Sequence, residues 1–230
     1  MMEFLFLDLD DTIYDFGKAE EVAICKTLRH FGIEPTPEVI GRYSVINKAQ
    51  WERLERGELT RDQVKVRRFE LLYAELGVNA SAAATHDFYA EQLSIGHYFM
   101  DGAEELLETL TKREYRLFLA SNGTLSVQEG RIASGGIAKY FEKIFISEQM
   151  GAVKPQKEFF DACFAQIPGF ARERAVIFGD SLTSDILGGI NAGIKTCWFN
   201  PKGKPGREDI HPDGEIQHLS QFVPWLEGQI

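Results

Sequence analysis

The chain has 230 residues, 44% of them hydrophobic, and a formal net charge of -10. This length and hydrophobic content are enough for one large domain, or for a core domain that carries a smaller one. The acidic balance argues against a nucleic acid polymer or an anionic membrane surface as partner, because neither attracts an acidic protein. A small anionic substrate remains compatible if the site supplies positive charge locally.

The chain opens with a short strand that the pattern predicts to be fully buried. Four apolar residues at 4–7 end abruptly in the sequence Asp8-Leu9-Asp10-Asp11-Thr12. From about residue 17 to 96 the pattern is helical throughout. It predicts an amphipathic helix at 18–31, a second opened by Thr36-Pro37, a third opened by a capping box at 60–63, and a fourth after Ser81. Four helices with short connections predict a small bundle.

From Asp101 onward, predicted helices and strands alternate. Strands are expected at 116–120, 143–146, 175–178 and 196–199, and helices at 102–112, 125–134, 157–166 and 183–192. This alternation predicts an α/β protein with a doubly wound parallel sheet to which the first strand also belongs. Residues 201–214 are expected to form an exposed loop before the last helix. We therefore expect a core formed by residues 1–16 and 97–230, with residues 17–96 as an inserted α-helical domain.

The three cysteines, Cys25, Cys163 and Cys197, are scattered and odd in number. They indicate neither a disulfide framework nor a zinc site, and we expect reduced thiols. The N-terminus has no basic region ahead of a long apolar stretch, and no segment approaches the length needed to span a bilayer. These features predict a cytoplasmic protein with no membrane partner.

Polar residues follow four of the predicted strands. They are Asp8 with Asp10, then Ser121-Asn122-Gly123, then Lys154-Pro155, and finally Asp180 with Asp185. Each signal alone is more often a turn or a helix start. Because the carboxyl ends of parallel strands meet at one edge of a sheet, we expect all four sets to converge there. Acids crowded together are costly without a compensating cation, so the pattern predicts a metal site.

The residue types at this edge are suited to phosphoryl transfer. Asp8 is the expected nucleophile, because a carboxylate attacks phosphorus and divides one displacement into two easier ones. Asp10 is the expected general acid and base. Mg²⁺ prefers oxygen ligands, which Asp8, a carbonyl near Asp10 and Asp180 supply, with Asp185 holding the waters of the metal. The donors expected to bind the phosphoryl group are Ser121, the amides around Asn122 and Gly123, and Lys154.

With these motifs in place, the sequence resembles the haloacid dehalogenase-superfamily hydrolases over essentially its whole length. Motif one is Asp8 to Thr12, motif two centres on Ser121, motif three on Lys154, and motif four is Asp180 with Asp185. The resemblance implies a Rossmann-like core, magnesium-dependent phosphoryl transfer through Asp8, and a helical cap inserted after motif one. Asp10 favours phosphatases and sugar-phosphate mutases, because the dehalogenase and phosphonate-cleaving branches lack an acid at this position.

The helical insertion resembles the cap of bacterial pyrimidine nucleotide 5′-phosphatases. The similar stretches are residues 47–51, 57–60 and 68–70, together with 184–193 and 196–198 of the core. This resemblance implies a nucleoside 5′-monophosphatase, with Asn47, Trp51 and Arg68 as candidates for contacting the substrate. Trp51 is equally compatible with packing in the bundle core, and Arg68 with a solvated surface position.

Two other functions stay open. One is a phosphoryl mutase or sugar-phosphate phosphatase of the same fold, which would use the same aspartyl-phosphate. The other is a non-catalytic protein that only binds a phosphorylated ligand, although such a protein could lose the acids that are all present here. In each case the expected partner is a small phosphorylated metabolite.

Overall fold

The computed structural model describes residues 2–228, which contain a six-stranded sheet in the order β3-β2-β1-β4-β5-β6. Each neighbouring pair of strands is parallel. The strands are β1 (Phe4–Leu7), β2 (Arg116–Ser121), β3 (Lys143–Ile146), β4 (Ala175–Gly179), β5 (Lys195–Phe199) and β6 (Gly214–Ile216). The predicted parallel α/β sheet is confirmed.

Strand β6 is the part of the sheet that the sequence did not predict. It starts at the end of the segment expected to be a loop, and it pairs with β5 through Gly214, Glu215 and Ile216. Of these three residues only Ile216 is buried, so the strand has no alternating pattern of its own. Its place depends on pairing with β5, which a local pattern does not reveal.

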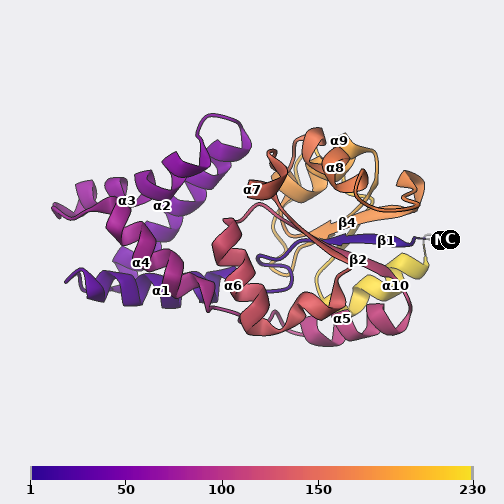
Figure 1. The fold of residues 1–230 in the computed structure, drawn as a ribbon, viewed down its shortest axis with the longest axis horizontal. Helices are drawn as coiled ribbons and strands as arrows, with labels where there is room; N and C mark the ends of the chain where they lie inside the picture. Colours follow the sequence, from indigo (N-terminus) through magenta and orange to yellow (C-terminus); the bar gives the residue numbers. More distant parts are fainter. Residues whose placement is uncertain (1, 229–230) are drawn as a thin grey trace.

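Helices cover both faces of the sheet, as Figure 1 shows, with α5 and α10 on one side and α8 and α9 on the other. Strand β1 contributes Leu5 and Leu7 to the first layer and Phe4 and Phe6 to the second, which explains its unbroken apolar run. The bounds of the core helices are α5 (Ala103–Lys112), α6 (Leu125–Gly135), α7 (Ser147–Met150), α8 (Lys157–Phe164), α9 (Leu187–Ala192) and α10 (Phe222–Glu227). Shorter helical segments are η1 (Ile137–Tyr140), η2 (Arg172–Arg174), the π-helical η3 (Leu182–Ile186) and η4 (Leu219–Gln221).

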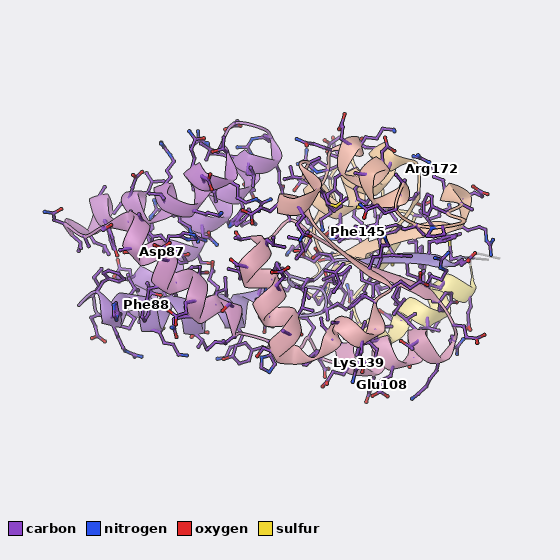
Figure 2. All side chains as sticks on the ribbon, in the orientation of Figure 1. Asp87, Phe88, Glu108, Lys139, Phe145 and Arg172 are labelled. Carbon is purple, nitrogen blue, oxygen red and sulfur yellow. The ribbon has the colours of Figure 1, made fainter. Side chains whose placement is uncertain are left out.

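The side chains divide between this core and the surface. Figure 2 shows Phe145 among the side chains packed at the sheet, where it is 2% exposed, and Lys139 and Glu108 on the outside of the molecule. Within residues 2–228, no helix combines the length and the apolar character needed to cross a bilayer.

Between β1 and α5 the chain forms a bundle of four helices, which we call the insertion. Its helices are α1 (Phe16–His30), α2 (Pro37–Glu55), α3 (Arg61–Leu76) and α4 (Ala82–Ser94). Each begins after a residue whose side chain accepts a hydrogen bond from the first turn, namely Asp15, Thr36, Thr60 and Ser81. The predicted capping box is present, because Thr60 and Gln63 exchange side-chain-to-backbone hydrogen bonds.

The insertion has an apolar core separate from the two layers of the sheet. Tyr43, Phe69 and Tyr89 meet at its centre, with ring centroids 5.3 to 5.6 Å apart. Val127 of α6 also belongs to this cluster, so the insertion rests on α6. Figure 1 shows the insertion at one end of the molecule, with α6 between it and the sheet.

Candidate active site

A buried lysine joins two of the acids that end strands of the sheet. Lys154 Nζ lies 2.6 Å from Asp8 Oδ1, 2.6 Å from Asp185 Oδ1 and 2.6 Å from the carbonyl oxygen of Ala120. Lys154 and Asp185 are each 1% exposed and Asp8 is 6% exposed. Burial disfavours the ammonium, but the two carboxylates outweigh that effect and raise the pKa of Lys154. The lysine is therefore charged and has an acceptor for each of its three donors.

Asp180 adds a third carboxylate close to those of Asp8 and Asp185. Asp8, Asp180 and Asp185 each offer an oxygen, and these oxygens lie within 4.8 Å of one another. Gly179 makes this possible, because a Cβ there would lie only 2.2 Å from Asp185 Oδ2. Burial, with the charges of Asp185 and Asp11, raises the pKa of Asp180 to about 8. Burial and Asp185 also raise the pKa of Asp8 well above its usual value despite Lys154. The ammonium groups of Lys154 and of Lys204, which lies near Asp180, do not prevent these pKa values from rising, and the oxygen donors of the cluster fit Mg²⁺.

The carboxylate of Asp10 is held by α6. Its Oδ2 accepts a hydrogen bond of 2.6 Å from Gln128 Nε2, and its Oδ1 accepts one from Arg131 Nη1. Gln128 Nε2 also donates to Ser121 Oγ at 2.8 Å. A Cβ at Gly123 would lie 2.3 Å from Gln128 Nε2, so this glycine leaves space for the glutamine. These hydrogen bonds place Asp10 beside Ser121. The side chain of Asp10 is 29% exposed.

The loop after β2 is joined to the segment that carries Lys154. Asn122 Oδ1 accepts from Lys154 N at 2.9 Å, and Asn122 Nδ2 donates to Lys154 O at 2.9 Å and to Ser184 Oγ at 3.1 Å. The Oγ of Ser121 accepts from Gly123 N at 3.1 Å as well as from Gln128. Since Ser121 Oγ accepts both of these bonds, its hydroxyl hydrogen is left to donate to a ligand.

The eight residues that the sequence predicted for this edge therefore lie around one location, whatever their individual roles. They are Asp8, Asp10, Ser121, Asn122, Gly123, Lys154, Asp180 and Asp185. Thr12 connects two of them, because its Oγ1 lies 3.4 Å from Asp8 Oδ2 and accepts from Asp180 N at 3.1 Å.

Sequence reasoning missed two groups of polar residues at the site. Gln128 and Arg131 are the first; they lie one turn apart on α6, the helix that follows the Ser121 loop, and that position was the available signal. The second group consists of Glu55, which accepts from Thr183 Oγ1 at 3.3 Å, and Lys204, whose Nζ lies 3.6 Å from Asp180 Oδ2. Burial and the charge of Asp185 raise the pKa of Glu55 to about 7. Neither residue stands in a local motif that would single it out.

The three candidates in the insertion are placed differently. Asn47 and Arg68 are 2% and 4% exposed, and Arg68 Nη1 donates to Asn47 Oδ1 at 2.8 Å. Asn47 Nδ2 in turn donates to Glu20 Oε1 at 2.6 Å. The alternative of Arg68 as a solvated cation is wrong, because helix packing buries it. Trp51 lies partly exposed and outside the apolar core, with the guanidinium carbon of Arg61 5.5 Å from its ring centroid.

A cavity of about 430 Å³ lies where the insertion meets the core. It is lined by residues from 54–62 of the insertion and from 147–156 of the core, among them Val153, which precedes Lys154. The eight residues of the sheet edge do not line it. This volume is in the range of small-molecule pockets.

Comparisons with known proteins identify the family of this chain. A family model described as haloacid dehalogenase-like hydrolase matches residues 5–199. The chain is 39% identical to the HAD-hydrolase YfnB of Bacillus subtilis, covering 95% of this chain and 92% of YfnB. It is 35% identical to the pyrimidine 5′-nucleotidase PynA of Streptococcus pneumoniae (99% and 96% covered) and 28% identical to the pyrimidine 5′-nucleotidase YjjG of Escherichia coli (97% of each).

The solved structures agree as well. A crystal structure of YfnB bound to magnesium superimposes with a TM-score of 0.93 at 38% identity, covering 98% of both chains. The family predicted from the motifs is confirmed: this chain belongs to the haloacid dehalogenase-like hydrolases.

Proposed function

We propose that this protein is a magnesium-dependent phosphatase that hydrolyses a nucleoside 5′-monophosphate through an aspartyl-phosphate on Asp8. The observation that supports this most directly is the group of three close carboxylates with a single buried lysine. In this proposal residues 1–16 and 97–230 form the catalytic core and residues 17–96 form its cap.

In the first step Asp8 attacks the phosphorus of the substrate. A bond forms between a carboxylate oxygen and phosphorus, and the bond from phosphorus to the ester oxygen breaks. Asp10 donates a proton to that leaving oxygen. The partial exposure of Asp10 supports this role, because the leaving group and water can both reach it.

In the second step the aspartyl-phosphate is hydrolysed. The carboxylate of Asp10 takes a proton from a water molecule, whose oxygen attacks the phosphorus. The bond between phosphorus and Asp8 then breaks, which releases inorganic phosphate and restores the carboxylate. Gln128 and Arg131 keep Asp10 in position for both proton transfers.

The phosphoryl group would be bound by donors from two loops. The hydroxyl of Ser121, the backbone around Asn122 and Gly123, and the ammonium of Lys154 provide them. Asp8, Asp180 and the carbonyl of Asp10 would hold Mg²⁺, with Asp185 beside it, and the bound ion would supply positive charge to the phosphoryl oxygens.

The names of PynA and YjjG support a nucleotide as substrate. The cavity between the insertion and the core offers room for a nucleoside. Among the three candidates in the insertion, Trp51 presents exposed aromatic surface for a base. Asn47 and Arg68 would have to give up their mutual hydrogen bond to contact a ligand.

Phosphate release by the purified protein tests this proposal. Pyrimidine and purine nucleoside 5′-monophosphates and hexose phosphates would be compared at equal concentration, with Mg²⁺ and with EDTA. We expect fastest release from pyrimidine nucleotides, no release in EDTA, and loss of activity in Asp8→Asn. Asp101→Asn is the matched control, because Asp101 is an exposed acid that no motif includes.

Two results would contradict the proposal. One is turnover by Asp8→Asn close to that of the wild type. The other is isomerisation of a hexose phosphate without stoichiometric phosphate release, which would identify a mutase.

A further inference from the structure

Helix α3 of the insertion contacts the loop that carries the phosphate-binding residues. Arg61, the first residue of α3, donates from Nη1 to the carbonyl oxygen of Asn122 at 2.7 Å and to that of Gly123 at 3.0 Å. Its Nη2 donates to Ser147 Oγ at 2.5 Å. One guanidinium thus connects the insertion to the ends of two strands, β2 and β3.

A second residue of α3 repeats this connection one turn later. Lys65 Nζ lies 2.9 Å from Glu148 Oε1, next to Ser147, and its side chain is only 18% exposed. Glu148 Oε2 accepts from Leu125 N at 2.6 Å, at the start of α6. The two cations therefore hold adjacent parts of one core surface, residues 122–125 with 147–148.

The position of Arg61 is fixed from its own side. The capping box of Thr60 and Gln63 sets the first turn of α3, and Trp51 of α2 lies against the guanidinium. Its three hydrogen-bond acceptors among the described residues are uncharged. Arg61 is half-buried, and the nearby charges of Glu148 and Asp62 only partly offset the desolvation that lowers the pKa of its guanidinium, so this arrangement does not arise from charge pairing alone.

The contacts of Arg61 bear on the phosphate-binding loop through peptide geometry. The carbonyl of Asn122 and the N–H of Gly123 belong to one planar peptide unit and point in opposite directions, as do the carbonyl of Gly123 and the N–H of Thr124. A donor that fixes the two carbonyls also fixes the two amides, of which the Gly123 N–H donates to Ser121 Oγ and so helps to orient that hydroxyl. When the insertion separates from the core, this constraint on the loop is lost.

We propose that Arg61 is a positioning residue that gives the Ser121–Thr124 loop its phosphate-binding geometry only when the insertion is docked on the core. This deepens the proposed phosphatase function and rests on it for its kinetic consequences. Arg61 would act on the phosphoryl end of every substrate, since it holds the loop and not the leaving group. Trp51, on this account, supports Arg61 and need not stack on a base.

Steady-state kinetics with two substrates test the proposal. In Arg61→Ala we expect kcat for a pyrimidine nucleotide and for p-nitrophenyl phosphate to fall by a similar factor, about 10- to 100-fold, as for loss of charged hydrogen bonds. Arg61→Lys keeps the positive charge but lacks the planar guanidinium. Its log kcat should therefore lie closer to that of Arg61→Ala than to that of the wild type. Arg67→Ala, an exposed arginine of the same helix, should behave as the wild type.

A rise in KM for the nucleotide alone, with kcat unchanged, would overturn the proposal and make Arg61 a nucleoside contact. Unchanged kinetics with both substrates would also overturn it. Ser147→Ala removes one acceptor from the core side without altering the insertion, and it should lower kcat in the same direction. Its effect should not add to that of Arg61→Ala, because the two residues share one contact.

Hydrogen exchange gives a second test that needs no turnover. Peptides covering residues 122–125 should exchange faster in Arg61→Ala than in the wild type or Arg67→Ala, while peptides of β1 stay protected. Equal exchange in all three proteins would contradict the proposal. If the wild type hydrolyses no phosphate ester, the proposed function fails, whereas the exchange result still decides whether Arg61 holds the loop.

Discussion

The sheet edge and the insertion both bury charged side chains, but they balance them differently. In the insertion, Glu20 and Arg68 form a closed network of one anion and one cation through Asn47. His86 contacts Arg68, and burial and Arg68 lower its pKa to about 4, so it adds no charge at neutral pH. At the sheet edge, the fully buried ammonium of Lys154 pairs with two of three close carboxylates, and the third, Asp180, faces the partly exposed Lys204. A buried network whose members are all paired is costly to break, whereas carboxylates whose pKa values are raised by one another point to a functional site.

The largest expected effect is on catalysis at the sheet edge. Asp10→Asn should lower kcat by about 10²- to 10⁴-fold for a nucleotide, because general acid and base catalysis is lost. The loss should be smaller for p-nitrophenyl phosphate, whose leaving group needs little protonation. Parallel kinetics with both substrates measure the difference, and equal losses would argue against Asp10 as the general acid.

Removing the buried cation should have the next largest effect. Lys154→Met leaves Asp8 and Asp185 without their shared partner, and we expect the metal-free protein to lose about 3 to 5 kcal/mol of unfolding free energy. Lys157→Met is the control, because Lys157 pairs with Asp161 at the surface and its loss should cost under about 1 kcal/mol. Urea unfolding in EDTA compares the two variants. Similar losses of unfolding free energy in the two variants would contradict this prediction, because they would show that Lys154 stabilises the protein no more than the surface residue Lys157 does.

The polar residues at the sheet edge can be predicted from the sequence, whereas the buried network of the insertion cannot. Asp8 and Asp180 were predictable, because each follows a buried strand and parallel strands end at one edge. The network of Glu20, Asn47 and Arg68 was not, because it depends on which faces of α1, α2 and α3 meet. The sequence therefore suggested substrate contacts for Asn47 and Arg68, where the structure shows an internal pair. Glu55 and Lys204 could not be predicted for the same reason. The packing of the insertion against the core brings Glu55 to the site, and the course of the loop after β5 brings Lys204 there.

The balanced network makes a smaller prediction. Asn47→Ala leaves the facing groups of Glu20 and Arg68 unsatisfied and should cost about 1 to 3 kcal/mol in unfolding free energy. We expect kcat/KM to change by less than about threefold, which is under 1 kcal/mol. Thermal unfolding and nucleotide kinetics on the same preparation provide both values. Unchanged stability with a selective rise in KM would instead make Asn47 a substrate contact.

The last expected effect concerns pH. Because the pKa of Asp180 is raised to about 8, this carboxyl is protonated at neutral pH in the metal-free protein. Mg²⁺ must displace that proton, so its affinity should rise up to about tenfold per pH unit from pH 6 to 8 and then level off. The native state also binds more protons than the unfolded state here, so metal-free stability should fall as pH rises from about 4 to 8. Calorimetric titration with Mg²⁺ measures the first trend, and a pH-independent affinity would contradict it.

The covalent intermediate provides the most direct measurement of the central claim. Enzyme quenched during turnover of a pyrimidine nucleotide would be treated with borohydride, which reduces an acyl phosphate to an alcohol, and its peptides analysed by mass spectrometry. We expect homoserine in place of Asp8 in the wild type and none in Asp8→Asn. Reduction at a different carboxylate, or at none while phosphate is being released, would contradict the assignment of Asp8 as the nucleophile.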